Sequence, residues 1–307
     1  MEFAKESDSD ITLQQLRCFI AAVDHGAFMK AANHLGISQP SLSAHISNLE
    51  EALGVELFDR TRRPARLTGG GEEMVGLARR ALTGVDDILT GVGEVLSLTR
   101  GLVRVGVTPS LGTTLLPKIL SDFKSSYPGI VIEVREKGSD ELESDLNEGA
   151  LDLALVTMTH WHSATQGMML YREDLVAIVN YQHTLADRDE IYIRELDDED
   201  MIMFRQGYDL RTTTQAAMRE AGVSPKVSID GAEISSVKGY VEAGLGVAVV
   251  PEGIVAGSYG IKAIRLVPRV TREIGVVTGR GLGSRASRAM FEQITSTKTP
   301  LYNTRKR

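Results

Sequence analysis

The strongest constraint on the fold is a run of apolar residues between Glu72 and about Thr99, which recur at alternating steps of four and three. This alternation is typical of a coiled-coil helix, whose apolar stripe must pack against a partner. Glycines inside the run weaken an isolated helix by about 1 kcal/mol each, so packing has to supply the stability. We therefore expect a long dimerisation helix; the alternative is a helix packed on the domain that follows it. The expected seam is Met74, Ala78, Ala81, Val85, Ile88, Val92 and Val95.

The segment before this long helix predicts three shorter helices. Apolar residues recur there at helical spacing, and capping residues and glycines mark the helix ends. Two short helices joined by a tight turn that contains glycine are typical of a helix-turn-helix, whose second helix enters the major groove of DNA. The predicted helices begin after Thr12 and end near Gly26, run from Met29 to Leu35, and begin at Ser38 and end at Gly54.

The third of these helices carries an uncharged polar face. With Leu42, Ile46 and Leu49 toward the core, the opposite side presents hydroxyl, amide and imidazole groups that suit base edges and phosphates. A small three-helix bundle with a polar outer face is the alternative interpretation. The predicted DNA contacts on this helix are Ser38, Gln39, Pro40, Ser41, Ser43 and His45.

Charge is distributed unevenly along the chain. The 34 Lys and Arg residues against 41 Asp and Glu give a net charge of -7, which argues against a broad basic footprint. The segment from Phe58 to Arg66 nevertheless holds four arginines and one aspartate. Such a run is either a solvated loop or, after a helix-turn-helix, a basic wing that reaches phosphates or the minor groove. We expect a wing that binds DNA through Arg60, Arg62 and Arg63.

Two motifs stand close together in this part of the chain. They are A-A-x-x-L-x-x-S-Q-P-S-L-S, from Ala31 to Ser43, and L-F-x-R-T-R, from Leu57 to Arg62. With them the chain resembles the LysR-type transcriptional regulators over about residues 12–297. The resemblance implies an α+β multidomain chain with an N-terminal winged helix-turn-helix (12–68), a linker and dimerisation helix (69–99) and a two-lobed α/β effector domain (100–297) with a periplasmic-binding-protein-like fold.

The sequence departs from the family pattern at three places. Family members usually carry hydroxyl residues at the positions of Ala27 and Met29, so the resemblance predicts the loss of two phosphate contacts. His45 stands where arginine or glutamine is frequent, which predicts a different base preference. Gly69–Gly71 replaces the family's helix-starting turn, and three glycines predict a flexible joint after the wing.

After Arg100 the pattern changes to alternating strands and helices. Right-handed crossovers close such βαβ units into a parallel, doubly wound sheet. By the resemblance, lobe I comprises about 101–160 and 267–297 and lobe II about 161–266, with crossovers near Met158–Thr165 and Ile264–Pro268. Strands are expected at 102–107, 130–136, 151–156, 175–179, 201–204, 227–229, 247–250 and 274–279, and helices at 112–127, 140–148, 210–221, 233–243 and 285–294.

Ligands of open α/β sheets bind outside the carboxyl ends of the strands. Hydroxyl groups and free N–H groups at helix N-termini there favour a carboxylate or another small anion. Arg205 and Arg211 add positive charge. Trp161, Phe204 and Tyr208 offer apolar walls. Helix capping is the alternative role of the hydroxyls, whereas the resemblance implies effector contacts. The predicted effector contacts are Thr108, Ser110, Gly138, Ser139, Phe204, Arg205 and Tyr208.

No catalytic residue, metal site or cofactor is predicted. His160 and His162 lack a third ligand at suitable spacing, and the acidic run Asp197–Asp200 fits a solvated loop. The glycines of Gly279–Gly283 lack the full phosphate-binding spacing. Cys18 is the only cysteine, which excludes a two-cysteine redox switch within one chain and predicts a buried structural thiol.

The expected location is the cytoplasm. The first ten residues are acidic where a secretory signal is basic and then apolar, and no apolar stretch approaches the roughly 20 residues that span a bilayer. The expected partners are double-stranded promoter DNA, a small-molecule effector and a second copy of the chain, without a membrane. The resemblance further implies a tetramer and contact with RNA polymerase.

The sequence therefore favours a transcriptional regulator whose promoter binding or activation is modulated by a small-molecule effector, a small organic acid. The alternative is a cytoplasmic small-molecule binding protein without DNA-dependent regulation. A binding protein for transport would need an export signal. An α/β enzyme with an appended helical domain is disfavoured, because neither a nucleophile elbow nor a phosphate-binding loop is present.

Overall fold

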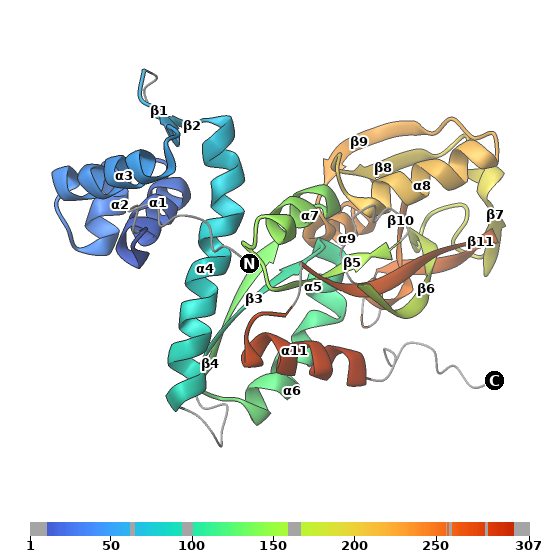
Figure 1. The fold of residues 1–307 in the computed structure, drawn as a ribbon. Helices are drawn as coiled ribbons and strands as arrows, with labels where there is room; N and C mark the ends of the chain where they lie inside the picture. The colour runs from blue at the N-terminus through green and yellow to red at the C-terminus, as the bar shows by residue number, and fades with distance from the viewer. Residues whose placement is uncertain are drawn as a thin grey trace, which may run out of the picture. The chain divides into compact units, whose positions relative to one another are not determined.

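A computed structural model describes residues 11–61, 65–93, 101–158, 167–255, 257, 260–279 and 282–297 (Figure 1). The chain divides into two compact units. The first comprises residues 1–96 with 147–150, and the second comprises 97–146 with 151–307. Among the described residues, no helix is both long and apolar enough to cross a membrane.

The first unit begins with the three predicted helices. Thr12 forms a capping box with Gln15, and Gly26, Gly36 and Gly54 end the helices in the left-handed conformation that favours glycine. The elements of this unit are α1 (Leu13–His25), α2 (Phe28–Leu35), α3 (Gln39–Leu53), β1 (Phe58–Asp59), β2 (Arg66–Leu67) and α4 (Gly69–Gly93). The predicted positions of the three helices are therefore confirmed to within one residue.

The core of the first unit joins the helices to the antiparallel β1–β2 wing. Phe19 and Leu42 are fully buried, as are Ile46 and Leu49. The Phe58 ring at the start of the wing lies 5.7 Å from that of Phe19, in an edge-to-face arrangement. Because this ring sits inside the helical core, the wing is anchored where it leaves α3.

The expected flexible joint at Gly69–Gly71 is wrong. These glycines form the first turn of α4, where the Thr68 Oγ1 accepts the Gly71 N–H at 3.0 Å. A Cβ at Gly71 would lie 2.2 Å from the Leu57 carbonyl oxygen. Glycine is needed here because the helix and the wing backbone approach closely, not because the chain bends.

The first turns of α4 pack on their own unit. Val75 and Ala78 are buried in the helical core, and Leu82 is partly buried against it, whereas the Leu77 side chain is 55% exposed. The first turns of the helix thus belong to the core of their own unit, a contact that the sequence analysis did not predict. Side chains beyond Val85, including most of the second half of the expected seam, lie outside the described residues, and dimerisation through α4 stays a prediction.

The second unit is built on a mixed seven-stranded sheet with the order β10-β6-β11-β5-β3-β4, in which β7 pairs with β11. The neighbours β5-β3-β4 are parallel, as predicted, whereas β10-β6, β6-β11 and β11-β5 are antiparallel. A parallel pair, β8–β9, forms a separate two-stranded sheet. The strands are β3 (Gly101–Val107), β4 (Ile130–Glu136), β5 (Leu153–Thr157), β6 (Gly167–Asn180), β7 (Glu190–Tyr192), β8 (Asp200–Phe204), β9 (Lys226–Ala232), β10 (Ala248–Pro251) and β11 (Ile261–Thr278).

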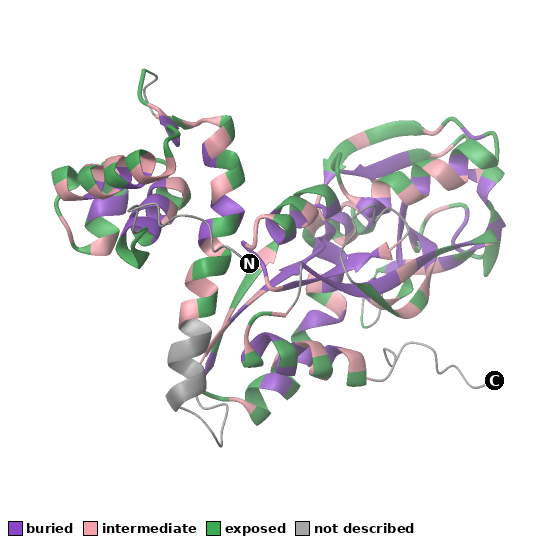
Figure 2. Ribbon diagram, viewed as in Figure 1, coloured by how far each residue is buried: buried purple, intermediate pink, exposed green. Residues whose placement is uncertain are grey.

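Helices cover the strands of this unit (Figure 2). The strands β5 and β10 are buried throughout, whereas most residues of β4 and β9 are exposed or half-buried. The single helix predicted at 112–127 is wrong, because Pro117 lacks an N–H group and starts a new helix after a break at Leu115. The helices are α5 (Pro109–Thr114), α6 (Leu116–Ser126), α7 (Ser139–Asn147), η2 (Ile193–Leu196), α8 (Asp209–Glu220), α9 (Ile234–Glu242), α10 (Glu252–Val255) and α11 (Arg285–Ser296).

Two long strands, β6 and β11, connect two hydrophobic cores. Leu175–Val179 of β6 and the first half of β11 lie in one core with β8, β10 and α9. Ile274 and Val276 of β11 lie in the other core with β3, β5 and α6. Their pairing shifts register between Arg265 and Val270, inside the second predicted crossover. The first predicted crossover falls mostly on 159–166, outside the described residues.

Candidate functional site

The outer face of α3 is where the sequence predicts base contacts. Leu42, Ile46 and Leu49 hold the opposite face at 0% exposure, so the orientation of the helix is fixed. The Ser38 Oγ accepts the Ser41 N–H at 3.3 Å and caps the helix. Ser38, Gln39 and Pro40 are exposed, and Ser41, Ser43 and His45 are half-buried.

The wing is tied to α3 by Arg60. Its Nη2 donates to the Ser47 Oγ at 3.0 Å and to the Glu50 Oε2 at 2.6 Å. The other carboxylate oxygen of Glu50 accepts the backbone N–H groups of Leu57 and Phe58 at 2.9 and 3.2 Å. Glu50 thus orients both the wing and the predicted DNA contact Arg60.

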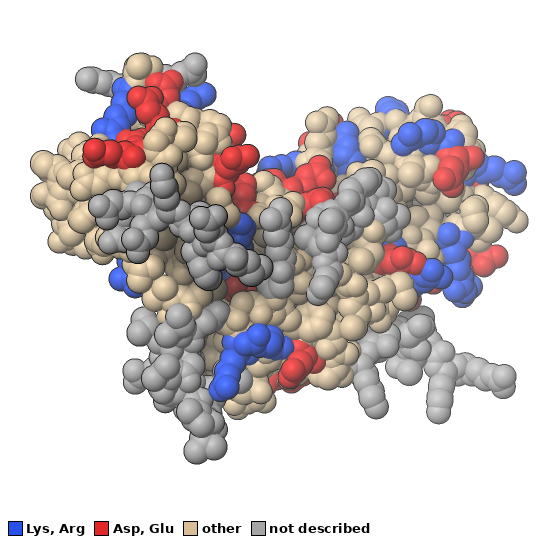
Figure 3. Space-filling view, viewed as in Figure 1, with Lys and Arg blue, Asp and Glu red and all other residues tan. Residues whose placement is uncertain are grey.

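The remaining predicted wing arginines, Arg62 and Arg63, lie outside the described residues. Arg66 on β2 is exposed and has no ion-pair partner among the residues that the structure describes. It belongs to the same basic run and is absent from the predicted contacts. Basic and acidic side chains both lie over the wing (Figure 3), so the charge available to phosphates depends on which arginines are left unpaired.

The α2 helix lacks a side-chain cap. Ala27 occupies its N-cap position without a side-chain hydrogen bond, and Met29 is 64% exposed. The start of α2 therefore carries a half-buried methyl group and an exposed thioether side chain, and the expected loss of two phosphate contacts there stays a prediction.

The predicted effector contacts come from loops that the fold brings together. Thr108 follows β3, Gly138 and Ser139 follow β4, and Tyr208 lies after β8. A Cβ built on Gly138 would lie 2.6 Å from the Gly207 carbonyl oxygen and 3.8 Å from the Tyr208 ring. The loop after β4 and the loop after β8 are therefore in direct contact.

Two of the predicted hydroxyl groups are buried without a hydrogen-bond partner among the described residues. They are the Thr108 Oγ1 and the Ser139 Oγ, on residues that are 1% and 8% exposed. Thr108 is the N-cap of α5, yet its side chain makes no capping bond, so helix capping does not account for it. A buried hydroxyl without a partner is costly, so these two groups are candidates for a hydrogen bond to a bound molecule.

Ser110 belongs instead to an internal ion cluster. The fully buried Arg272 donates from Nη2 to the Ser110 Oγ at 2.8 Å and from Nη1 to the Asp209 Oδ2 at 2.6 Å. Its Nε donates to the Glu173 Oε1 at 2.6 Å. The Thr157 Oγ1 donates to the Asp209 Oδ2 at 2.7 Å. The cluster, called here the Arg272 cluster, joins α5, β5, β6, α8 and β11.

The charged side chains of the Arg272 cluster pair with one another, Arg272 with both Glu173 and Asp209. Burial opposes the charged form of Arg272, but Asp209 and Glu173 outweigh it and hold the pKa of the guanidinium above its usual value. Burial raises the pKa of Glu173, against the pull of Arg272. Sequence reasoning missed this cluster; its one signal is an arginine close to the apolar end of β11.

A second polar group lies after β8. The Tyr208 hydroxyl donates to the Glu233 Oε2 at 2.8 Å, and the Arg205 Nη1 lies 3.8 Å from the Glu233 Oε1. Burial and this hydrogen bond raise the pKa of Tyr208 to about 12, so its phenol stays protonated. Phe204 differs from the prediction, because it is 2% exposed in the core with the rest of β8 and offers no wall to a ligand.

The sequence offered three other candidate features. Among the described residues no group of three His, Cys, Asp or Glu side chains is placed to hold a metal ion. His160, Trp161 and His162 lie outside those residues, as does part of Gly279–Gly283. Cys18 is buried, as predicted, and burial raises the pKa of its thiol.

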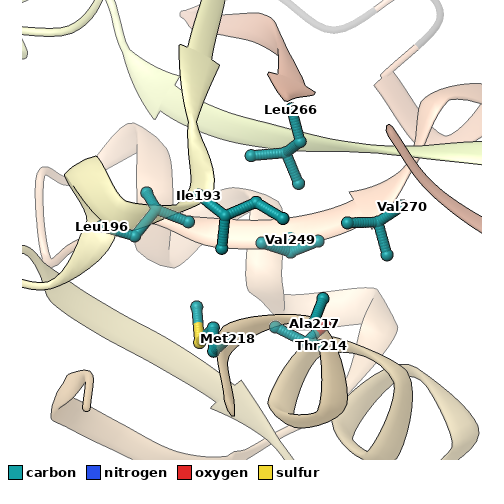
Figure 4. A pocket seen from close by; sticks show the side chains of 8 residues that line it. All are labelled: Ile193, Leu196, Thr214, Ala217, Met218, Val249, Leu266 and Val270. Atoms are coloured by element: carbon teal, nitrogen blue, oxygen red, sulfur yellow. The ribbon is translucent and has the colours of Figure 1, made fainter. Parts of the chain in front are cut away.

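A small cavity lies in the core that contains β8 and β10 (Figure 4). Its lining is apolar apart from Thr214, whose Oγ1 is buried without a partner among the described residues. None of the predicted effector contacts lines it. The lining residues are Ile193, Leu196, Thr214, Ala217, Met218, Val249, Leu266 and Val270.

Two family models match the chain. Residues 13–72 match "Bacterial regulatory helix-turn-helix protein, lysR family", and residues 97–298 match "LysR substrate binding domain". The chain belongs to the LysR family of transcriptional regulators. Proteins of the LysR family bind DNA and small-molecule effectors and form oligomers, and the family consists of regulators rather than enzymes.

Curated LysR relatives align over most of the chain. The "Uncharacterized HTH-type transcriptional regulator YybE" of Bacillus subtilis is 33% identical, over 87% of this chain and 92% of its own length. The "Transcriptional dual regulator GltC" of the same organism is 32% identical, over 86% of this chain and 90% of its own.

A solved LysR structure has the same fold. A full-length OxyR variant from Pseudomonas aeruginosa superposes with a TM-score of 0.78 and covers 96% of this chain and 98% of its own. At 22% identity this likeness concerns the fold alone. The two family-model matches and this shared fold together confirm the predicted architecture, a helix-turn-helix unit followed by an α/β effector-binding unit.

Proposed function

We propose that this LysR regulator binds promoter DNA in the cytoplasm and that a small organic acid modulates its promoter binding or activation. The observation that carries the DNA half is the exposed, uncharged polar start of α3 opposite a completely buried face. The observation that carries the effector half is the pair of buried, unpartnered hydroxyls at the ends of β3 and β4.

The α3 helix reads bases in the major groove. Its exposed first turn offers hydroxyl and amide groups for base edges, and the wing arginines Arg60, Arg62 and Arg63 contact phosphates or the minor groove. Glu50 holds Arg60 beside α3, so that one edge of the Arg60 guanidinium group forms an ion pair within the protein. The proposed base contacts are Ser38, Gln39, Pro40, Ser41, Ser43 and His45.

The effector binds where the loops after β3, β4 and β8 meet. Thr108 and Ser139 donate hydroxyl hydrogen bonds to its carboxylate, and Gly138 permits the close approach of the two loops. Arg205 and Tyr208 close the other side. Ser110 acts indirectly, because its hydroxyl is bonded to Arg272.

The assembly is a dimer through α4, and a pair of dimers forms a tetramer on DNA that contacts RNA polymerase. In this proposal residues 12–68 bind DNA, 69–99 link and dimerise, and 100–297 bind the effector as two lobes. The exposed Leu77 leaves an apolar position on α4 that its own unit does not cover.

A footprint on DNA from just upstream of the gene tests this function. The full-length protein, titrated at two salt concentrations with random-sequence competitor, is expected to protect two or more helical turns, because a dimer reads two half-sites. A protein that binds small molecules without DNA-dependent regulation gives no specific protection at either salt concentration, and that result overturns the proposal.

A further inference from the structure

The described cations around the proposed effector site are already paired within the protein. Arginine and lysine side chains near the loops after β4 and β8 each lie within ion-pair distance of a carboxylate, so carboxylates of the protein already balance their positive charge. An anionic effector therefore meets no unpaired cation among the residues that the structure describes there. The pairs are Arg272 with Glu173 and Asp209, Arg205 with Glu233, Arg211 with Asp230, and Arg135 and Lys137 with Asp145.

Glu136 differs from these paired cations, because it is an acidic residue without a paired cation among the described residues. It is the last residue of β4, in register with Val107 of β3, at the carboxyl edge of the parallel strands. Its side chain turns toward α5, because a Cβ on Gly112 would lie 3.0 Å from the Glu136 Oε2. It is exposed and has no ion-pair partner among the described residues.

Glu136 and Glu233 are both linked to Tyr208, because the Tyr208 hydroxyl donates to Glu233 and the Tyr208 ring lies against Gly138, two residues after Glu136. Partial burial raises the pKa of Glu136, and the charge of Glu233 raises it further. Both carboxylates also raise the pKa of Tyr208, whose ring lies against the Gly138 position. Glu136 comes from the end of β4 and Glu233 from the N-cap of α9, so two separate segments place negative charge there.

Unpartnered hydroxyls mark the same loops independently. Ser139 lies three residues after Glu136. Thr108 follows Val107, which pairs in register with Glu136. Both hydroxyl oxygens are buried, and helix capping leaves them unsatisfied. The loops after β3 and β4 thus carry both hydroxyl donors and a carboxylate acceptor.

We infer that the effector is a zwitterion of the amino-acid type, whose cationic amine binds between Glu136 and Glu233 while its carboxylate accepts from Thr108 and Ser139. This inference rests on the proposed effector site and narrows the class of acid. A plain organic acid would bring a further negative charge near Glu136, whose carboxylate no described cation pairs with, whereas an ammonium group neutralises that carboxylate.

Paired compounds test this inference. Full-length protein is mixed with each of the twenty standard amino acids and with the 2-hydroxy acid of the same carbon skeleton, and thermal unfolding and operator affinity are measured. At least one amino acid is expected to raise Tm and change operator affinity, while its hydroxy acid does neither. Stabilisation by hydroxy acids in preference, or by no amino acid, overturns the inference.

Glu136→Gln assigns the effect to the carboxylate. The active amino acid is expected to bind this variant at least about tenfold more weakly, because a charged hydrogen-bond partner is lost. Glu133→Gln, on the same strand but exposed and paired with Arg104, is the matched control and should bind as the wild type does. Equal binding by the two variants and the wild type contradicts the inference.

Operator binding distinguishes a failure of the proposed function from a failure of the zwitterion inference alone. If the wild-type protein forms no specific operator complex, the proposed function fails. The other outcome is a complex that forms and responds to a hydroxy acid, with the Glu136→Gln variant responding as the wild type does. In that case the proposed function stands and only the zwitterion inference fails.

Discussion

At the scale of the residue, the buried Arg272 shows how much one side chain can organise. Its guanidinium reaches Ser110, Glu173 and Asp209 from the second half of β11, although these partners are separated from it by 63 to 162 residues. Taking such charges out of water costs several kcal/mol per ion, and close pairing offsets this cost. The cluster therefore sets the relative position of α5, β6 and α8.

Arg272→Met is expected to lower the free energy of unfolding by roughly 3–5 kcal/mol, because it leaves Asp209 and Glu173 buried without their cation. Urea unfolding of the full-length protein measures the change. Arg265→Met, which removes an arginine of the same strand with a 65% exposed side chain, should change stability by no more than about 0.5 kcal/mol. Similar losses in both variants would contradict this role of the cluster.

The phenol of Tyr208 provides a second test at this scale. Its pKa is raised to about 12, first by burial and then by Glu233, from an ordinary value near 10. Its contribution to stability is therefore fully present below about pH 10 and is lost as the pH rises toward 12. Ultraviolet titration, with the Tyr208→Phe variant subtracted, should show no tyrosinate from this residue below about pH 11. A midpoint near 10 would contradict the structure.

Single residues were predictable from sequence where their partners are local. Thr12, Gly36 and Ser38 act within a few residues of themselves, so their capping roles follow from the sequence. The opposing carboxylates Glu136 and Glu233 were missed, because no local pattern links residues that the sheet brings together across the chain.

At the scale of the element, the ends of the first three helices were predictable, whereas the break between α5 and α6 and the long strands were not. Helices depend on local spacing and caps, which the sequence displays. The strands β6 and β11 carry charged residues such as Arg172, Glu173 and Glu273 in their middles, so only their apolar halves were predicted. These polar stretches lie between two cores, where strand pairing and ion pairs replace apolar packing.

The start of α4 gives a prediction for an element. Gly71→Ala should destabilise the first unit by roughly 1–3 kcal/mol, because the new Cβ meets the Leu57 carbonyl and forces the wing to move. Gly84→Ala, in the same helix with nothing within 4 Å, should stabilise by up to about 1 kcal/mol. Thermal unfolding of both variants measures the difference. A neutral or stabilising Gly71→Ala would show that the contact is not tight.

At the scale of the whole molecule, a regulator needs two activities in one chain. One unit presents α3 and its wing, and the other holds the Arg272 cluster beside the loops that carry Thr108, Ser139 and Glu136. An effector that favours one state by about 1–3 kcal/mol is enough to change promoter occupancy usefully. That amount is comparable to satisfying one or two buried hydroxyls.

The family and the order of its parts were predictable because the helix-turn-helix motifs are local and specific. The chemistry of the effector site was not. The strand-end rule pointed to loops of which two, after β4 and β8, are in direct contact, and the effector site there stays a proposal. The rule also predicted a positively biased cleft, whereas the described cations near these loops are paired and Glu136 has no described cation partner. The charge of a site depends on pairing in three dimensions, which a list of arginines in the sequence does not reveal.

The central claim, sequence-specific DNA binding by α3, is tested most directly by fluorescence anisotropy. The affinity of the full-length protein for DNA from upstream of its gene is compared with that for a scrambled duplex at two salt concentrations. The wild type should prefer the upstream DNA by at least about 10³-fold. Gln39→Ala should lose about 1–3 kcal/mol of that preference at an unchanged salt slope, because the contact proposed for Gln39 is with bases rather than phosphates. Equal affinity of the wild type for both duplexes, at either salt concentration, would contradict the account.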